Sequence, residues 1–324
     1  MTLPLAFDSQ FDRQGLAAKL SALAAQGIHI GTSSWKYSGW RNQLYDEARY
    51  VYRGKFSESR FERHCLSEYA EVFKTVCVDA AYYQFPAASF VDGLMAQVPS
   101  DFVFSFKVTD EITVKRFPNL PRFGARAGEP NAHFLSADLF ASAFLAPFER
   151  HQSQVGVLLF EFSRFYSSDF ARGRDFVEAL AQFLEGLPKG WRYGVEIRNK
   201  NFLQEDYFSM LRQHGVAHVF NSWDAMPSIS EQLELAGGVT GDFAAARFLL
   251  KPGRKYEDAV KSFSPYDRIH EVNEEGRSAA ARILRESMVE HKRRKVFLYV
   301  NNRFEGNALE TIVGMLVKAG LSYR

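Results

Sequence analysis

Cysteine is scarce in this sequence, which has only Cys65 and Cys77 among 324 residues. The two lack the spacing of a zinc site and the density of a disulfide framework, so we expect reduced thiols in the core. Long apolar runs are also missing, since none approaches the ~18 residues that a membrane span requires. Residues 1–14 contain Asp8 and Asp12 but no apolar signal segment, which favours a cytoplasmic protein with no membrane partner.

The sequence also has little net charge and no cofactor motif. Its 40 basic and 38 acidic residues leave a net charge of +2, so no global field favours nucleic acid or an anionic membrane. No Gly-x-Gly-x-x-Gly turn follows the first predicted strand, which argues against a dinucleotide-binding fold. His29 and His218 stand alone on predicted strands, as core histidines rather than converging metal ligands. We therefore expect no cofactor and no metal.

Helices and strands alternate along the chain. Apolar runs predict strands at residues 28–34, 75–81, 102–107, 155–160, 193–199, 217–220, 244–250 and 296–300. Apolar residues at helical spacing predict helices at residues 11–26, 57–73, 88–98, 137–150, 169–187, 206–214, 274–292 and 308–319. Two stretches without a strong period, 109–136 and 251–273, are predicted to be long loops after the third and seventh strands, and the first is a candidate lid or binding loop.

About eight strand-helix alternations with continuously apolar strands indicate parallel strands covered by helices. A TIM-type (β/α)8 barrel, of the α/β class, fits this order best, and an open doubly wound sheet is the alternative. Because no linker is visible, we predict one barrel domain at residues 28–324, preceded by a helical extension at residues 1–27.

The most informative strand contains an acid and a base on the same side. Side chains two positions apart in a strand share a face, so Glu196 and Arg198 point one way while Val195 and Ile197 point the other. Burying ions is costly unless they are paired or face a polar cavity. The shared face therefore carries either a functional site or a structural ion pair, and the sequence favours neither interpretation over the other.

Polar residues gather at the carboxyl ends of the predicted strands, which meet at one mouth of a barrel. They are Asp79, Lys107, Glu161, Glu196, Arg198, Asp224, Arg247, Asn301 and Asn302. The carboxylates Glu161, Glu196 and Asp79 are the candidate catalytic groups for acid-base or hydrolytic chemistry. The bases Lys107, Arg198 and Arg247 suggest a clamp for an anion. The plain alternative is that these acids and bases only neutralise one another.

Aromatic residues make up 15% of the chain, and several follow the first two strands. A stacking wall for a ligand ring could be built from Trp35, Tyr37, Trp40, Tyr82 and Tyr83, although core packing is the favoured role for each one.

The basic run at residues 291–295 precedes the last strand, opposite the predicted mouth, and a solvated helix end explains it better than nucleic-acid binding.

Taken together, several segments resemble the YecE-like family, known as domain of unknown function 72, from Ile28 to the C-terminus. The matching segments are residues 31–40, Thr75-Val76, Tyr82-Tyr83, Pro86, residues 102–107, Ile112-Thr113, Glu196-Ile197-Arg198, Asp224, Arg247, Asn301-Asn302 and Glu305-Gly306. The resemblance implies a barrel with a shared mouth, and it supplies no reaction.

The chain departs from the family pattern at several mouth positions. The family has Glu, Asn, His, Gln and His where this sequence has Cys77, Asp79, Val114, Glu161 and Asn199, and apolar residues replace the His-Gly after Arg247. These departures indicate a divergent branch and argue against chemistry that depends on those histidines.

Three functions remain open at this point. The first is an enzyme acting on a small anionic or polyhydroxylated ligand, bound by Lys107, Arg198 and Arg247, with Glu196 or Glu161 handling protons. The second is a non-catalytic ligand-binding or regulatory barrel that uses the same pocket. The third is nucleic-acid processing, for which binding would weaken strongly with salt and which the net charge disfavours. The sequence assigns no oligomeric state.

Overall fold

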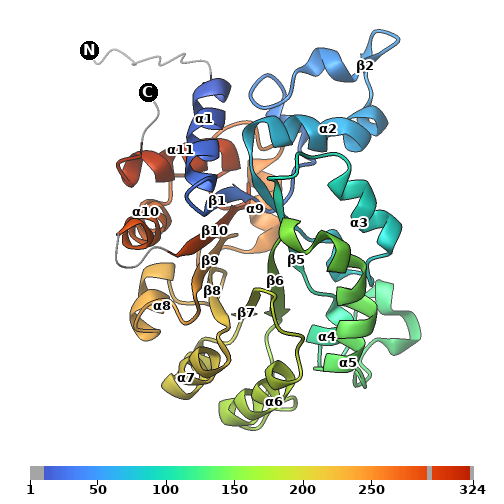
Figure 1. Ribbon diagram of the computed structural model, residues 1–324, viewed down its shortest axis with the longest axis vertical. Helices are drawn as coiled ribbons and strands as arrows, with labels where there is room; N and C mark the ends of the chain where they lie inside the picture. The colour runs from blue at the N-terminus through green and yellow to red at the C-terminus, as the bar shows by residue number, and fades with distance from the viewer. Residues whose placement is uncertain (1–10, 290–293, 322–324) are drawn as a thin grey trace.

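Eight parallel strands close into a ring at the centre of the computed structural model, which describes residues 11–289 and 294–321 (Figure 1). The order around the ring is β1-β10-β9-β8-β7-β6-β5-β4, so strands adjacent in sequence are neighbours. The strands are β1 (Ile28–Thr32), β4 (Thr75–Val78), β5 (Val103–Lys107), β6 (Val155–Phe162), β7 (Tyr193–Ile197), β8 (Ala217–Ser222), β9 (Phe243–Phe248) and β10 (Lys295–Val300). The predicted TIM-type barrel is confirmed.

The helices surround this ring (Figure 1). They are α1 (Arg13–Ala24), α2 (Glu58–Val72), α3 (Ala88–Met95), α4 (Asp110–Thr113), α5 (Ala137–Leu139), α6 (Gly173–Glu185), α7 (Glu205–His214), α8 (Ile229–Leu235), α9 (Tyr256–Phe263), α10 (Glu274–Met288) and α11 (Ala308–Lys318). In the ranges that the structure describes, no helix combines the length and the apolar character that crossing a membrane demands.

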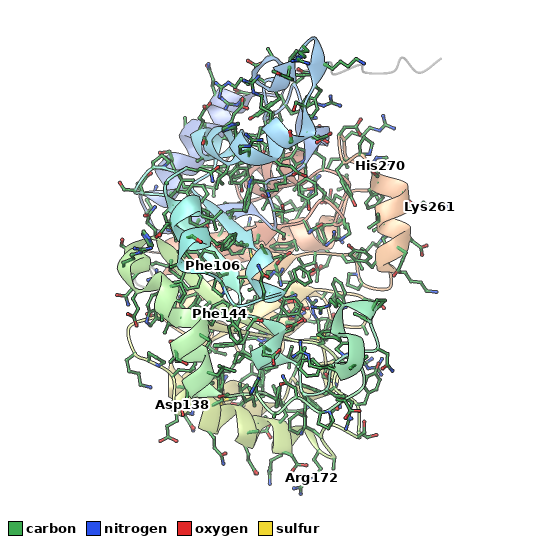
Figure 2. All side chains as sticks on the ribbon, turned by 90° about the vertical axis from the view of Figure 1, so that its right-hand side faces the viewer. Phe106, Asp138, Phe144, Arg172, Lys261 and His270 are labelled. Carbon is green, nitrogen blue, oxygen red and sulfur yellow. The ribbon has the colours of Figure 1, made fainter. Side chains whose placement is uncertain are left out.

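The core has two layers because each strand buries both faces. Between strands and helices lies the larger apolar cluster, which includes Phe106 and Phe144, and Leu16 of α1 belongs to the same cluster. A second cluster, which includes Val157, Ala245 and Tyr299, comes from the opposite faces of the strands. Charged side chains such as Arg172 and Lys261 lie at the periphery instead (Figure 2).

Glycine at position 31 lets β1 approach β4 closely. A Cβ atom at this position would lie 2.2 Å from the carbonyl oxygen of Thr75, closer than a real Cβ contact allows. Because the obstacle is backbone, a side chain here would have to push the two strands apart.

Several predicted elements differ in the structure. The helix predicted at residues 137–150 is instead α5 followed by a π-helix, Phe140–Leu145, and a 3-10 helix, Ala146–Gln154, because Pro147 has no N–H to donate. The predicted loop at 251–273 contains α9, and α8 lies between β8 and β9, where no helix was predicted. The predicted loop at 109–136 contains α4 and a 3-10 helix, Pro121–Arg126.

The N-terminal and basic segments are described only in part. Residues 1–10 of the predicted extension lie outside the described residues, while α1 follows with Leu16 and Leu20 buried. Most of the basic run, residues 291–293, also lies outside them. Ser57 accepts a hydrogen bond from the backbone N–H of Arg60 and so caps α2.

Candidate functional site

An ion network fills the carboxyl end of the barrel, and Glu161 is at its centre. Its Oε2 lies 3.0 Å from Nζ of Lys107, 3.3 Å from Nη2 of Arg198 and 2.9 Å from Nη1 of Arg247. These three cations come from β5, the end of β7 and β9, so the barrel brings together residues that are far apart in sequence. The predicted clustering of these side chains is what the structure shows.

Glu196 is the most deeply buried acid of the network. Because β6 and β7 pair Glu161 with Glu196, the two carboxylates enter the barrel at the same level. Glu196 Oε2 accepts a hydrogen bond of 2.9 Å from Arg247, and Oε1 lies 2.5 Å from Nη2 of Arg198. This second contact is an ion pair without hydrogen-bond alignment, since Oε1 has no hydrogen-bond partner among the described residues.

Asp79 follows β4 and is the exposed member of the network. Its Oδ1 lies 3.3 Å from Nη2 of Arg247, and its side chain is 40% exposed, whereas the side chain of Glu196 is fully buried. With Asp79 included, three acids face three bases, so the formal charges balance. The network needs no external anion for neutrality.

The network holds Glu161 and Lys107 in the ionised form. Burial alone would raise the pKa of Glu161, but the charges of Lys107, Arg198 and Arg247 more than offset it and lower the pKa well below its usual value. For Lys107 burial acts to lower the pKa, and the charge of Glu161 reverses this, so the pKa is raised. Both side chains are therefore charged at neutral pH.

Neighbouring side chains fix the orientation of two of the cations. The guanidinium of Arg198 lies 4.2 Å from the ring centroid of Trp223 and donates a hydrogen bond of 3.2 Å to Asn221 Oδ1. The ammonium of Lys107 lies 3.5 Å from the ring centroid of Tyr82. Such cation–π contacts strengthen when the cation is desolvated, as both are here. In the sequence, only their position after a predicted strand pointed to Asn221 and Trp223 as residues of the site.

A pocket of about 430 Å³ adjoins the network at Asp79. It lies between the segments after β1 and β4 and α3, and its lining includes Ser33, Trp35 and Cys77. Two buried polar atoms here, Ser33 Oγ and Trp35 Nε1, have no hydrogen-bond partner in the described part of the chain. Trp35 is 7% exposed and Ser33 is 1% exposed, so both residues belong to the wall of the pocket and these two polar atoms are buried within it.

Other predicted aromatic and amide residues serve packing. Trp40 is fully buried, and its Nε1 donates a hydrogen bond of 3.2 Å to Asn302 Oδ1, which also accepts from the backbone N–H of Ala308 at the start of α11. Tyr37 packs against Trp40, with ring centroids 4.8 Å apart. Asn302 and Trp40 therefore join β10 and α11 to the segment after β1.

The remaining predicted residues lie around the mouth without joining the network. Tyr83 is 63% exposed, in contrast to the buried Tyr82 beside it. Asp224 is exposed after β8. Asn301 is buried, and its Oδ1 accepts a hydrogen bond from the backbone N–H of Arg303.

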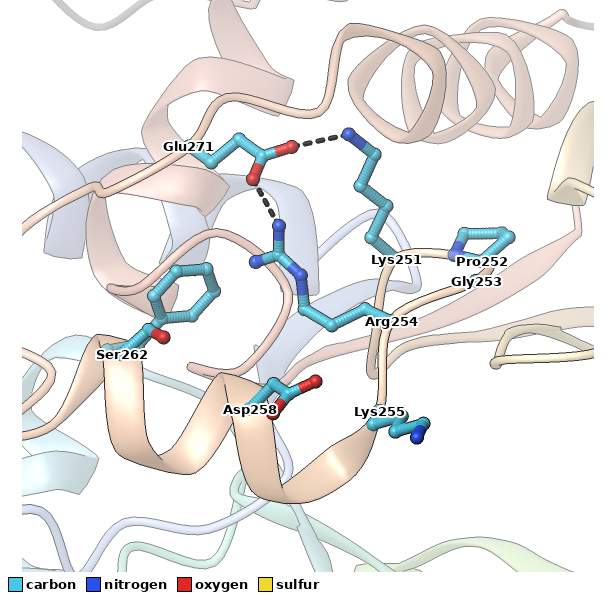
Figure 3. A pocket seen from close by; sticks show the side chains of 9 residues that line it. Lys251, Pro252, Gly253, Arg254, Lys255, Asp258, Ser262 and Glu271 are labelled. Atoms are coloured by element: carbon cyan, nitrogen blue, oxygen red, sulfur yellow. Dashed lines mark hydrogen bonds and ion pairs between the residues drawn. The ribbon is translucent and has the colours of Figure 1, made fainter.

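A second pocket follows β9, and ion pairs connect several of its lining residues (Figure 3). It has a volume of about 550 Å³, and Glu271 pairs there with both Lys251 and Arg254. Because one carboxylate engages both cations, this pocket offers a ligand anion less unpaired positive charge than its sequence suggests.

The histidines and cysteines give no sign of a metal centre. Among the described residues, no group of His, Cys, Asp and Glu could hold a metal ion. His218 contacts the Tyr207 hydroxyl at 3.0 Å and Gln232 Oε1 at 3.3 Å, as expected of a core histidine, while His29 stacks on Phe297. Cys77 is a free, buried thiol whose pKa burial raises to about 12, so it stays protonated beside Asp79.

Comparisons with known proteins agree with the fold. A family model described as "Protein of unknown function DUF72" matches residues 29–324. A DUF72 family structure from Enterococcus faecalis V583 is similar with a TM-score of 0.60 and 19% identity, covering 92% of this chain and 97% of that chain. One from Thermotoga maritima MSB8 has a TM-score of 0.57 and 19% identity, covering 91% and 98%. At these identities the structures support the fold alone. A search of curated proteins finds no match.

Proposed function

The chain belongs to the DUF72 family of proteins of unknown function, as its resemblance to the YecE-like family predicted, and from this premise we propose an enzymatic role. The proposed substrate is a small polyhydroxylated molecule bound at the carboxyl end of the barrel, in the pocket beside Asp79. Active sites of barrel enzymes lie at this end, where loops from several strands meet.

The position of Asp79 carries this proposal. It is the one acid of the network that also lines the 430 Å³ pocket, so it connects the buried charges to a space of ligand size. Arg247 holds the Asp79 carboxylate in place, while Glu161 and Glu196 hold Arg247. A carboxylate fixed in this way is suited to accept a proton from a ligand hydroxyl or from an attacking water.

Charge and hydrogen bonding favour a neutral, hydroxyl-rich ligand over an anion. The network is neutral with Asp79 included, so an anion that binds to the network would have to displace Asp79 from Arg247. The pocket's other charged lining residues, Lys36, Arg63 and Glu62, balance with Asp79 as two cations and two acids. A hydroxyl group can instead donate to Asp79, which lines the pocket, without disturbing any pair. Trp35 also offers an apolar surface of the kind that sugar rings stack on.

Glu161 has an electrostatic role in this proposal. Its pKa is lowered, against the effect of burial, by three cations, so it remains ionised and does not act as a general acid at neutral pH. Together with Glu196 it keeps Arg247 oriented toward Asp79. A hydrolytic reaction would therefore use Asp79 as the base that activates water.

A ligand screen with matched variants tests the proposal. Sugars and polyols that raise the melting temperature of the wild type are assayed for turnover, then repeated with Asp79→Asn and with Asp101→Asn. Asp101 is a suitable control because it pairs with Lys74 at the surface and is 62% exposed. We expect Asp79→Asn to abolish turnover and Asp101→Asn to leave it unchanged. Equal turnover in both variants contradicts the assignment of Asp79.

A non-catalytic binding barrel is the second candidate, and the completeness of the ion network favours it. Glu196 and Arg247 are buried and paired with each other, as expected of a structural cluster that braces the barrel. In this case a polyol would stabilise the wild type in an Asp79-dependent way and be recovered chemically unchanged after prolonged incubation. Turnover of any stabilising ligand would exclude this alternative.

A further inference from the structure

A cavity of about 510 Å³ lies between the segments that follow β5 and β6. Its lining includes the cations Lys115, Arg116 and Arg164, the acid Asp169 and the aromatic residue Tyr166. None of its lining residues belongs to the pocket beside Asp79. The cavity is large enough for a small organic ligand and is lined by three cations and one carboxylate.

The cations of this cavity form no ion pair with a carboxylate of the described residues. Lys115 is half-buried, with its ammonium 3.4 Å from the ring centroid of Phe170, and it forms no ion pair with a carboxylate in residues 11–289 and 294–321. Arg116 donates a hydrogen bond of 2.7 Å to the neutral carbonyl of Gly128. Arg164 lies 5.6 Å from the ring centroid of Tyr166, again a neutral partner.

The pocket after β9 shows basic residues that do have a carboxylate partner in the same protein. There Glu271 pairs with both Lys251 and Arg254 (Figure 3). In the cavity around Lys115, the one carboxylate is Asp169, and its Oδ2 accepts a hydrogen bond from the backbone N–H of Tyr166. A net positive charge therefore remains in the cavity around Lys115.

Burial of Lys115 has an energetic consequence. Desolvation lowers the pKa of its ammonium, and the charges of Asp169 and Asp175 oppose this only in part. An anion bound beside the ammonium would supply the missing partner and favour its charged form. Tyr166 is 64% exposed and would provide a flat surface next to the charges.

We propose that this cavity binds a small anion carrying at least two negative charges, such as a phosphorylated or polycarboxylated metabolite, with Lys115 as the central contact and Arg116 and Arg164 at its sides. Guanidinium groups suit carboxylate and phosphate geometry, and a lysine supplies a point charge. The site is independent of the polyol pocket and does not rest on the function proposed for it.

Isothermal titration calorimetry with pyrophosphate and with citrate, at low ionic strength, tests this site. We expect one saturable site in the wild type, and a loss of affinity of about tenfold or more in Lys115→Gln and in Arg164→Gln, because each removes a charge-assisted contact. Lys115→Arg keeps the charge and should retain most of the affinity. Arg254→Gln is the matched control and should bind as the wild type does, since Arg254 pairs with Glu271.

Four outcomes would overturn the proposal. The first is that neither probe binds the wild type at millimolar concentration, and the second is that Lys115→Gln binds the probe as tightly as the wild type does. The third is that the Arg254→Gln control loses as much affinity as Lys115→Gln. The fourth is that the affinity of the wild type does not fall when salt is added. Circular dichroism of each variant separates a lost site from a lost fold. If Lys115→Gln does not fold, comparison of Arg164→Gln with Arg254→Gln still decides the question.

Discussion

The charge network of the barrel mouth makes one quantitative prediction about stability. Glu196 is fully buried and contacts the guanidinium groups of Arg198 and Arg247. In Glu196→Gln the side chain keeps its shape, so no cavity forms, but two acids then face three bases in a desolvated site. Leaving one buried charge uncompensated costs about 3–5 kcal/mol. We expect the free energy of unfolding to fall by that amount.

Urea denaturation followed by circular dichroism measures this change. A shift of the midpoint with an unchanged slope reports on stability alone. Glu234→Gln is the control, because Glu234 is 71% exposed and lies 3.6 Å from Arg282 at the surface, where such pairs contribute little. The control midpoint should stay close to that of the wild type.

A double variant separates charge balance from loss of contacts. Glu196→Gln combined with Arg198→Gln restores equal numbers of acids and bases in the network. The double variant should therefore lose less stability than the sum of the single variants, with a coupling of about 0.5–3 kcal/mol. If Glu196→Gln behaves like the surface control, or if the two changes are additive, the network is not a coupled set of ionised groups.

Three further predictions concern acid stability and backbone packing. Burial alone would raise the pKa of Glu161, but the neighbouring cations lower it below 4.5. The ionised Glu161 therefore contributes its full stabilisation of the folded state above that pH, and this stabilisation is lost as the pH falls further. Between about pH 5 and pH 3, the urea midpoint should fall more in wild type than in Glu161→Gln, and equal falls would refute this. Burial lowers the pKa of His218 from 6.5 to about 4, so stability should decline as the pH drops between these values, because the unfolded chain takes up the proton first. His218→Gln should flatten that decline, and an unchanged pH profile would exclude the explanation. Gly31→Ala should lower the melting temperature because its Cβ meets the Thr75 carbonyl at 2.2 Å, whereas Gly93→Ala, with no heavy atom within 4 Å in helix α3, should raise it; shifts of the same sign would contradict the packing.

Local periodicity predicted the part of the site that depends on strand geometry. The alternation in β7 places Glu196 and Arg198 on one face, and the structure pairs them. Parallel strands of a barrel end at one mouth, so Lys107 and Arg247 were expected near them. The individual contacts were not predictable, because three cations converge on one oxygen of Glu161 only through the curvature of the closed barrel.

The surroundings of individual mouth residues could not be predicted from the sequence. Asn302 follows a strand, as a ligand-binding amide would, yet it serves Trp40 and the first turn of α11. Tyr82 and Tyr83 are adjacent and chemically identical, but one covers Lys107 and the other is exposed. Residue type and position do not distinguish an amide or a ring used for packing from one that faces a cavity, because that depends on neighbours distant in sequence.

Helices α8 and α9 were missed for a different reason. They have 7 and 8 residues, about two helical turns each, so the apolar spacing of a helix is hardly repeated within them. Prolines also lie near both helices. Short helices of this kind gain most of their stability from tertiary packing, so the local sequence carries a weak signal for them. The buried contacts of Leu233 and Phe263 supply that packing.

The role of Asp79 is tested most directly by a crystal structure of the protein soaked in a polyol that raises its melting temperature. We expect the ligand in the 430 Å³ pocket, with a hydroxyl group hydrogen-bonded to Asp79 and the Asp79–Arg247 contact retained. A ligand bound elsewhere, with the space beside Asp79 and Trp35 unoccupied, would contradict the proposed site.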